Sequence, residues 1–118
     1  MGCGRLLGGT AEQLWNSLCR IAGLPPDTAI YCAHEYTENN GRFALTVEPE
    51  NPALPARLEE VRDKRGRGLS TVPFRLREEL ATNPFLRTES QEIRSRLGMS
   101  KASDLAVFTR LRQLKDEF

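Results

Sequence analysis

The chain has 118 residues, of which 39% are hydrophobic and 28% are charged, and its formal net charge is +1 at neutral pH. This length suits one domain, no apolar stretch approaches the roughly 20 residues that cross a membrane, and the near-neutral charge argues against a globally basic nucleic-acid-binding protein. An odd number of cysteines without metal-site spacing, and an N-terminus without a signal-peptide pattern, predict a reduced, cytoplasmic protein. These cysteines are Cys3, Cys19 and Cys32.

A glycine-rich segment, residues 2–9, comes before the first predicted helix. It lacks the Gly-Lys-Ser/Thr ending of a phosphate-binding loop, and no general base accompanies Cys3 nearby in the sequence. Thr10 and Gln13 form a capping-box pattern, which predicts a helix that ends at Gly23. The stripe that this helix is expected to bury consists of Ala11, Leu14, Trp15, Leu18, Ile21 and Ala22.

Residues 28–33 are rich in strand-forming side chains, follow a Pro-Pro-Asp turn and predict a buried strand. The only histidine of the chain, His34, follows that strand, and Glu35 and Tyr36 come directly after it. Open α/β folds place their reactive groups at this edge of the sheet. A lone histidine can be a packed, hydrogen-bonded side chain, or it can be a metal ligand. Zinc sites need three or four protein ligands, so the other ligands would lie mostly outside this chain.

The remainder of the chain predicts helices separated by turns. Thr37 is expected to cap a helix that Pro49 stops, and Asn51 to cap a helix with Pro52 at its first position. In that second helix Arg57 should face water. Shorter helices are predicted over residues 75–81 and 90–97, and a last helix, capped by Ser103, over residues 103–116. One strand among about six helices cannot form a sheet, which indicates that part of the fold is absent.

Residues 32–37 read Cys-Ala-His-Glu-Tyr-Thr, and further ordered blocks lie on both sides of them. Residues 32–37 closely resemble the segment that carries the last metal-binding histidine of glyoxalase II, the hydroxyacylglutathione hydrolase family. The matching blocks cover nearly the whole chain, so it is similar to the C-terminal part of a glyoxalase II. The other blocks are residues 2–5, 9–13, 43–49, 71–73, 83–87 and 115–118.

The resemblance implies an α/β plus α-helical fold class. Residues 1–48 would be the last α/β elements of a metallo-β-lactamase αββα sandwich, and residues 49–118 the helical C-terminal domain of glyoxalase II. The Thr-His-x-His-x-Asp-His signature of that superfamily is absent from the sequence, as are a further histidine and a bridging aspartate. The active site is therefore expected to be incomplete in this chain.

The resemblance also implies a chemistry. Family members hold two divalent metal ions, which are zinc, iron or manganese, and a metal-bound water hydrolyses S-D-lactoylglutathione to D-lactate and glutathione. By this resemblance His34 is a ligand to the second metal, and no side chain of this chain is assigned a catalytic acid–base role. The residues expected to bind the glutathione part of the substrate are Arg5, Tyr36, Arg112 and Lys115.

Arg112 and Lys115 are three residues apart, so they should be neighbours on one face of the last helix. A solvated helix end is the other interpretation of this pair. One departure from the family pattern is Leu7, which stands where an aromatic residue is usual. Since leucine cannot donate a hydrogen bond, this departure puts the contacts of the glycine-rich segment with glutathione in question.

Three hypotheses follow. The first is a glyoxalase II fragment, a thioester hydrolase by family, inactive alone and expected to be a monomer without membrane or nucleic-acid partners at full length. The alternative is a non-catalytic glutathione-binding or structural module. The third is nucleic-acid binding through the basic run at residues 62–67, which has only Phe74 nearby for base stacking. A helix end in solvent accounts equally for that run.

Overall fold

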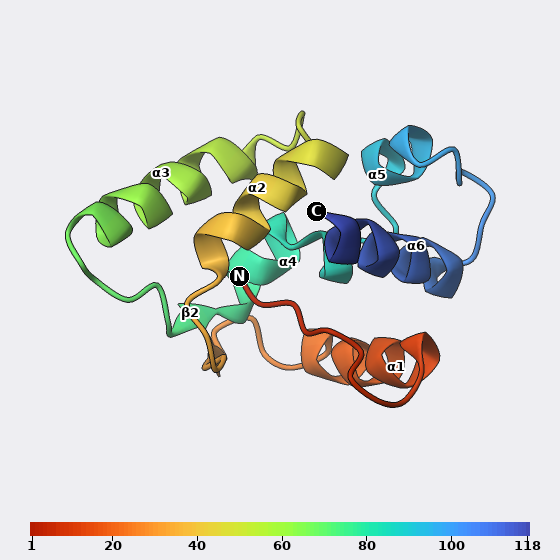
Figure 1. Ribbon diagram of the computed structural model, residues 1–118, viewed down its shortest axis with the longest axis horizontal. Coiled ribbons are helices and arrows are strands. Elements are labelled where there is room, and N and C mark those ends of the chain that lie inside the picture. The colour runs from red at the N-terminus through yellow and green to blue at the C-terminus, as the bar shows by residue number, and fades with distance from the viewer.

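Six α-helices, one 3₁₀ turn and a two-stranded sheet form the protein, in a computed structural model that describes all 118 residues. The molecule is elongated, with extents of 42 × 28 × 28 Å. In Figure 1, α1 and α6 lie on one side, α2 and α3 on the other, and α4 between them. The elements are α1 (Ala11–Ala22), β1 (Ala29–Ile30), α2 (Thr37–Val47), α3 (Ala53–Gly66), β2 (Phe74–Arg75), α4 (Leu76–Thr82), η1 (Pro84–Leu86), α5 (Gln91–Arg96) and α6 (Asp104–Glu117).

The main core lies where α2, η1, α5 and α6 meet. The ring of Phe85, on η1, lies 6.0 Å from the ring of Phe43 and 5.8 Å from that of Phe108, measured between centroids. The ring of Trp15, on α1, lies 5.4 Å from that of Phe108. The fully enclosed members of this core are Phe43, Val47, Phe85, Ile93, Val107, Phe108 and Leu111.

The predicted capping patterns are confirmed at two helices, α1 and α6. The Thr10 hydroxyl accepts a hydrogen bond from the Gln13 backbone amide (3.2 Å), and the Gln13 side chain accepts one from the Thr10 amide (2.9 Å), which completes the capping box of α1. The Ser103 hydroxyl caps α6 by accepting a hydrogen bond from the Ala106 amide, and the Ser90 hydroxyl, which was not predicted as a cap, accepts one from the Ile93 amide at the start of α5. The expected mostly helical character is therefore found. None of the helices is both long and apolar enough to cross a membrane.

The expected strand over residues 28–33 was too long, and the expected αββα sandwich is not in this chain. Only Ala29 and Ile30 are strand, and they pair antiparallel with Arg75 and Phe74. Residue 75 was expected to begin a helix, but its backbone is extended and α4 starts at Leu76. The strand that was expected to be alone thus has a partner, β2. The sequence did not predict β2 because a two-residue strand directly before a helix is too short to show an alternating pattern.

Two interpretations of side chains were wrong. Arg57 was expected to face water, but it is only 6% exposed: its guanidinium lies 5.9 Å from the Phe74 ring centroid and bonds Glu60 at 3.1 Å. Arginine can be covered in this way because its long stem is apolar. Thr37 was expected to cap α2, but it is the first residue of the helix and fully buried. Its hydroxyl instead accepts a hydrogen bond from the Met1 amine and lies at hydrogen-bond distance, 2.7 Å, from the Thr71 hydroxyl.

A buried carboxylate, Glu48, connects the end of α2 to the segment before α5. Its oxygens accept hydrogen bonds from Arg87 (2.7 and 2.8 Å), from the Ser90 hydroxyl (2.7 Å) and from the Asn51 amide (3.1 Å). Burial alone would raise the pKa of Glu48, but these hydrogen bonds and the Arg87 charge outweigh it and hold the pKa below its ordinary value. The charge on Glu48 therefore stabilises the fold.

Candidate functional site

His34 lies in the segment between β1 and α2, residues 31–36, where residues 33 and 34 form a bend, and its side chain is exposed. The imidazole stacks on the ring of Tyr36, with centroids 5.0 Å apart and planes within 9° of parallel. Tyr36 is itself 57% exposed. Both rings are therefore available to a molecule outside the chain, and His34 is not a packed core histidine.

No three histidine, cysteine, aspartate or glutamate side chains come together in a way that could hold a metal ion. The residues of this chain alone therefore do not fit a complete metal centre. The exposed imidazole of His34 can still supply one ligand to a centre whose other ligands come from elsewhere.

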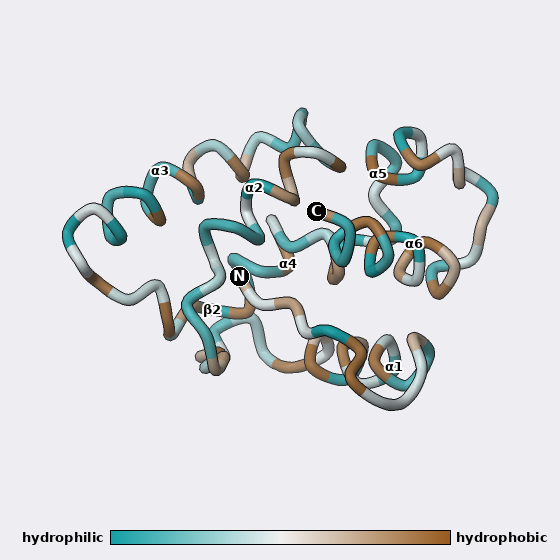
Figure 2. The backbone as a smooth tube through the Cα atoms, viewed as in Figure 1, coloured by the Kyte–Doolittle hydropathy of each residue, from teal (hydrophilic) through white to brown (hydrophobic).

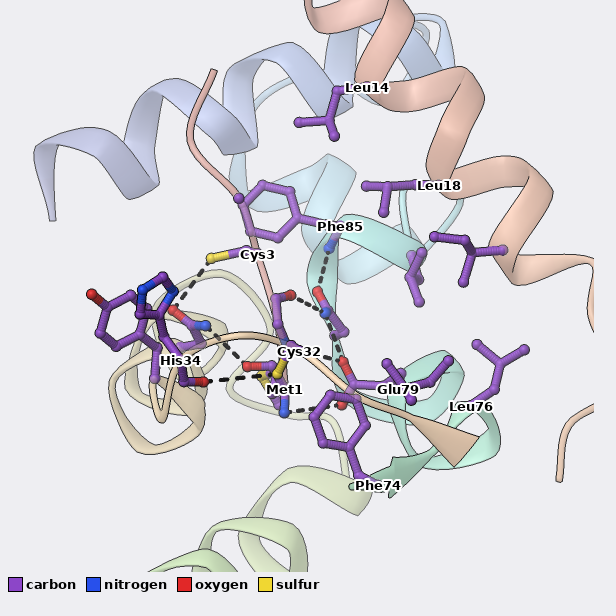
Figure 3. A pocket seen from close by; sticks show the side chains of 18 of the residues that line it. Met1, Cys3, Leu14, Leu18, Cys32, His34, Phe74, Leu76, Glu79 and Phe85 are labelled. Carbon is purple, nitrogen blue, oxygen red and sulfur yellow. Dashed lines mark hydrogen bonds and ion pairs between the residues drawn. The ribbon is translucent and has the colours of Figure 1, made fainter. Parts of the chain in front are cut away.

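A mostly apolar cavity of about 330 Å³ lies beside this segment. It is bounded by the first four residues, the inner face of α1, β1, the β2–α4 junction and η1, and His34 and Tyr36 are among its lining residues. Figure 3 shows Leu14 and Leu18 projecting from α1 into this space, with Cys3 and Cys32 elsewhere in its wall. An apolar space bounded by a few polar groups is the usual character of a binding site or an uncovered interface.

The segment Met1–Gly4 is held by side chains instead of a sheet. The Asn40 amide donates to the Met1 carbonyl (3.0 Å), and the Asn83 amide donates to the Gly2 carbonyl (2.7 Å). Glu79 accepts from the Gly2 amide at 3.4 Å and from Asn83 at 2.9 Å. Buried backbone groups need such partners wherever no strand supplies them.

Sequence reasoning missed Asn40, Glu79 and Asn83, although a signal was present for the first two. Asn40 lies three residues before Phe43 on the buried face of α2, and Glu79 lies three residues after Leu76 on the buried face of α4. A polar residue in an apolar helical stripe indicates a specific buried partner. The partner itself could not be read from the sequence, because it lies 39 residues from Asn40 and 77 from Glu79.

The two predicted cations of α6 differ in environment. Arg112 is 4% exposed: it donates to both the Gly4 carbonyl and Asp116, and its guanidinium lies 5.1 Å from the Phe85 ring centroid. Lys115 is half-buried and donates to the Asn39 side chain at 2.8 Å. Arg112 thus holds the glycine-rich segment in place, whereas the Lys115 ammonium keeps donors free for an external anion.

The remaining predicted contacts lie in the glycine-rich segment. Arg5 is exposed and has no hydrogen bond or ion pair, and the neighbouring Leu7 is 94% exposed. The structure therefore leaves the Arg5 side chain free for a ligand. It also leaves Leu7 without a packing role in the chain.

The basic run at the end of α3, residues 62–67, makes most of its contacts within its own segment. Lys64 pairs with Glu60 at 2.6 Å and Arg67 with Asp63 at 3.4 Å, each one helical turn apart, while Arg65 donates to the Leu69 carbonyl at 2.9 Å. These contacts favour the solvated helix end for this run.

Comparison with known proteins defines the class to which this fold and segment belong. Residues 35–118 match the family described as hydroxyacylglutathione hydrolase C-terminus. The whole chain is 55% identical to the hydroxyacylglutathione hydrolase of Methylococcus capsulatus and 52% identical to that of Rhizobium meliloti, in each case over 46% of the relative. That of Maricaulis maris is 50% identical over the same share.

The chain belongs to the hydroxyacylglutathione hydrolase family, as the resemblance predicted. It corresponds to the C-terminal part of these proteins and spans about half the length of the curated relatives it matches.

Proposed function

We propose that this chain is the C-terminal, substrate-binding part of a hydroxyacylglutathione hydrolase. The observation that carries the proposal is that all 118 residues match relatives of that name at 50–55% identity. The proposed reaction is hydrolysis of the thioester S-D-lactoylglutathione to D-lactate and glutathione, in methylglyoxal detoxification. The free thiols of Cys3, Cys19 and Cys32 suit a cytoplasmic location for this work.

The proposed contribution of this chain to catalysis is one metal ligand. The exposed His34 imidazole would complete a binuclear centre of zinc, iron or manganese whose other ligands are not in this sequence. Such a centre supplies a nucleophilic water near neutral pH. The stack on Tyr36 limits rotation of the His34 ring, which favours one direction of its ring nitrogens.

The proposed glutathione site consists of Arg5, Tyr36, Arg112 and Lys115. Lys115 and the exposed Arg5 would pair with the carboxylates of the tripeptide, and the Tyr36 hydroxyl would donate to its backbone. Arg112 would act chiefly through the Gly4 carbonyl that it holds, because its guanidinium is also paired with Asp116.

The second candidate is a non-catalytic glutathione-binding module. It is favoured by one observation, that no cluster of three metal-ligating side chains exists in the chain. Under this hypothesis the chain would bind glutathione through the same residues and turn nothing over.

One experiment separates the two. The chain is assayed for metal content and for hydrolysis of S-D-lactoylglutathione, both alone and joined to the N-terminal half of the Methylococcus capsulatus relative. We expect no turnover and no bound metal for the chain alone, and two metals with turnover for the joined protein. A joined protein that folds and binds glutathione but holds no metal would favour the module, and enzymatic turnover by the chain alone would contradict the incomplete site.

A further inference from the structure

The ammonium of Lys115, near the end of α6, is held by three neutral groups. It lies 5.3 Å from the ring centroid of Phe118 and 6.0 Å from that of Phe43, and it donates a hydrogen bond to the Asn39 side-chain oxygen at 2.8 Å. Both ring distances are within the range of cation–π contacts. No carboxylate of the chain forms an ion pair with this ammonium.

The two rings have different places in the fold. Phe43, on the inner face of α2, is 2% exposed and lies against Phe85 in the main core. Phe118 is 53% exposed, and its ring centroid lies 5.7 Å from that of Phe43, with the ring planes 62° apart. In Figure 1 the C-terminus accordingly lies between α6 and α2. Phe118 therefore continues the aromatic core to the surface, at the point where the Lys115 ammonium lies.

Neutral partners hold an ammonium without neutralising its charge. A lysine side chain is flexible, and immobilising it when a ligand binds costs conformational entropy. The two rings and the Asn39 side chain impose part of that order on Lys115 before any ligand binds. An ion pair would also order the side chain, but it would cancel the charge that attracts an anion. Arg112 shows this contrast, since it is paired with Asp116 at 2.7 Å.

We infer that Phe118 is a positioning residue, which together with Phe43 and Asn39 holds the Lys115 ammonium in place for a carboxylate of the ligand. The ligand part of this inference rests on the proposed function, since it takes that carboxylate to belong to glutathione. An ammonium has three N–H donors, and Asn39 accepts from one of them, so donors remain for the carboxylate. Phe118 acts through Lys115 and needs no contact with the ligand.

Phe118 also packs against Phe43, so its replacement can change the core as well as the position of the ammonium. Leucine keeps an apolar side chain beside Phe43 but has no π face, whereas tyrosine keeps the aromatic ring. Comparison of Phe118→Leu with Phe118→Tyr therefore distinguishes the contact with the ammonium from the packing of the core.

The first test uses the 118-residue chain without any ligand. The ε-methylene protons of Lys115 are measured by NMR, because the faces of nearby aromatic rings shift their resonances upfield. Phe118→Leu is expected to move these resonances toward those of Lys101, an exposed lysine of the same chain. Phe118→Tyr should leave them in place.

The matched control is Tyr31→Leu, which removes an aromatic ring that is 76% exposed and makes no cation–π contact with Lys115. It should leave the Lys115 resonances unchanged. Thermal midpoints are measured for every variant, so that loss of the ring contact is distinguished from loss of the fold. Unchanged Lys115 resonances in a folded Phe118→Leu variant would overturn the inference.

The second test measures binding of S-methylglutathione to the chain, because its blocked sulfur cannot exchange with the free cysteines. Phe118→Leu should weaken binding about two- to fivefold, the factor that corresponds to a partly exposed cation–π contact. In the Lys115→Ala background the same substitution should have no further effect, since no ammonium is left to position. An equal loss in both backgrounds would show that Phe118 acts only through packing, which would overturn the inference.

The proposed function and the positioning of Lys115 can fail separately. If the parent chain does not bind S-methylglutathione, the proposed glutathione site fails, while the NMR result still decides whether Phe118 positions Lys115. If the parent chain binds it and Phe118→Leu binds it equally tightly, the ligand part of the inference is wrong.

Discussion

Helices α1 and α6 lie side by side, yet they contribute to the molecule in opposite ways (Figure 1). The inner face of α6 packs against α1 and η1 as part of the main core, and it buries Val107, Phe108 and Leu111 completely. Helix α1 carries an equally regular apolar stripe, visible in Figure 2 as hydrophobic stretches along the helix, but none of its residues is buried. The difference lies in what covers each face.

The apolar face of α1 borders the cavity of about 330 Å³, and so do the segment Met1–Gly4 and His34. Monomeric proteins rarely leave such apolar surface uncovered without a function for it. Within this chain the apolar face of α1 is therefore open, whereas the inner face of α6 is closed. The closed region supplies stability, and the proposed function rests on the open region.

The largest effect expected from this comparison of closed and open regions is that of His34→Ala, measured in the chain joined to the N-terminal half of a relative. His34 is exposed, so its loss should leave the thermal midpoint nearly unchanged. Replacing a residue that only orients a metal ligand commonly costs about 10–100-fold in activity. Loss of the ligand itself should therefore lower kcat by at least about a hundredfold. Metal analysis should find one ion fewer. Retention of both metals and full activity would assign His34 no role in the centre.

The second test compares Phe108→Ala with Leu18→Ala in the chain, by urea denaturation. Phe108 is fully buried among aromatic rings, so its truncation should lower the free energy of unfolding by about 3–5 kcal/mol. Leu18 on α1 is only half-buried, and its truncation should cost about 1 kcal/mol. Equal losses would show that the α1 face contributes to the core as much as α6 does.

The third test concerns acid stability in the closed region. The pKa of Glu48 is lower in the folded state than in the unfolded state, because its hydrogen bonds outweigh its burial. Its stabilisation is thus present above the unfolded pKa, about 4.3, and is lost as pH falls through the folded pKa. Glu48→Gln should lower the free energy of unfolding by about 1.5–3 kcal/mol at pH 7 and flatten its dependence on pH below about 5.

The control for this measurement is Glu38→Gln, which breaks an exposed pair with Arg42 and should change the unfolding free energy by less than about 0.5 kcal/mol. An unchanged acid dependence in the Glu48→Gln variant would assign the pH response to other carboxylates.

The same division explains what the sequence could predict. The helices of the closed region follow from local rules: Ser103 caps α6, and Val107, Phe108 and Leu111 recur at helical spacing. The stripe of α1 was predicted with equal ease, but its exposure was not, because burial depends on what packs against it. The family blocks located His34. Thr71, whose backbone amide donates a hydrogen bond to Glu35, lies 36 residues from it and obeys no periodic rule.

The smallest expected effects distinguish the two cations of α6, Arg112 and Lys115. They are measured as changes in KM and in the unfolding free energy of the chain joined to the N-terminal half of a relative. Lys115→Ala should raise KM about tenfold with kcat little changed, because a charge-assisted hydrogen bond to a substrate carboxylate is worth roughly 1.5–3 kcal/mol and about 1.4 kcal/mol is one decade. Arg112→Ala should raise KM similarly and also lower the unfolding free energy, since it releases the Gly4 carbonyl and Asp116. Arg110→Ala, on the exposed side of the same helix, is the control and should change neither quantity. An unchanged KM in the Arg112→Ala, Lys115→Ala double variant would show that this end of α6 takes no part in binding glutathione.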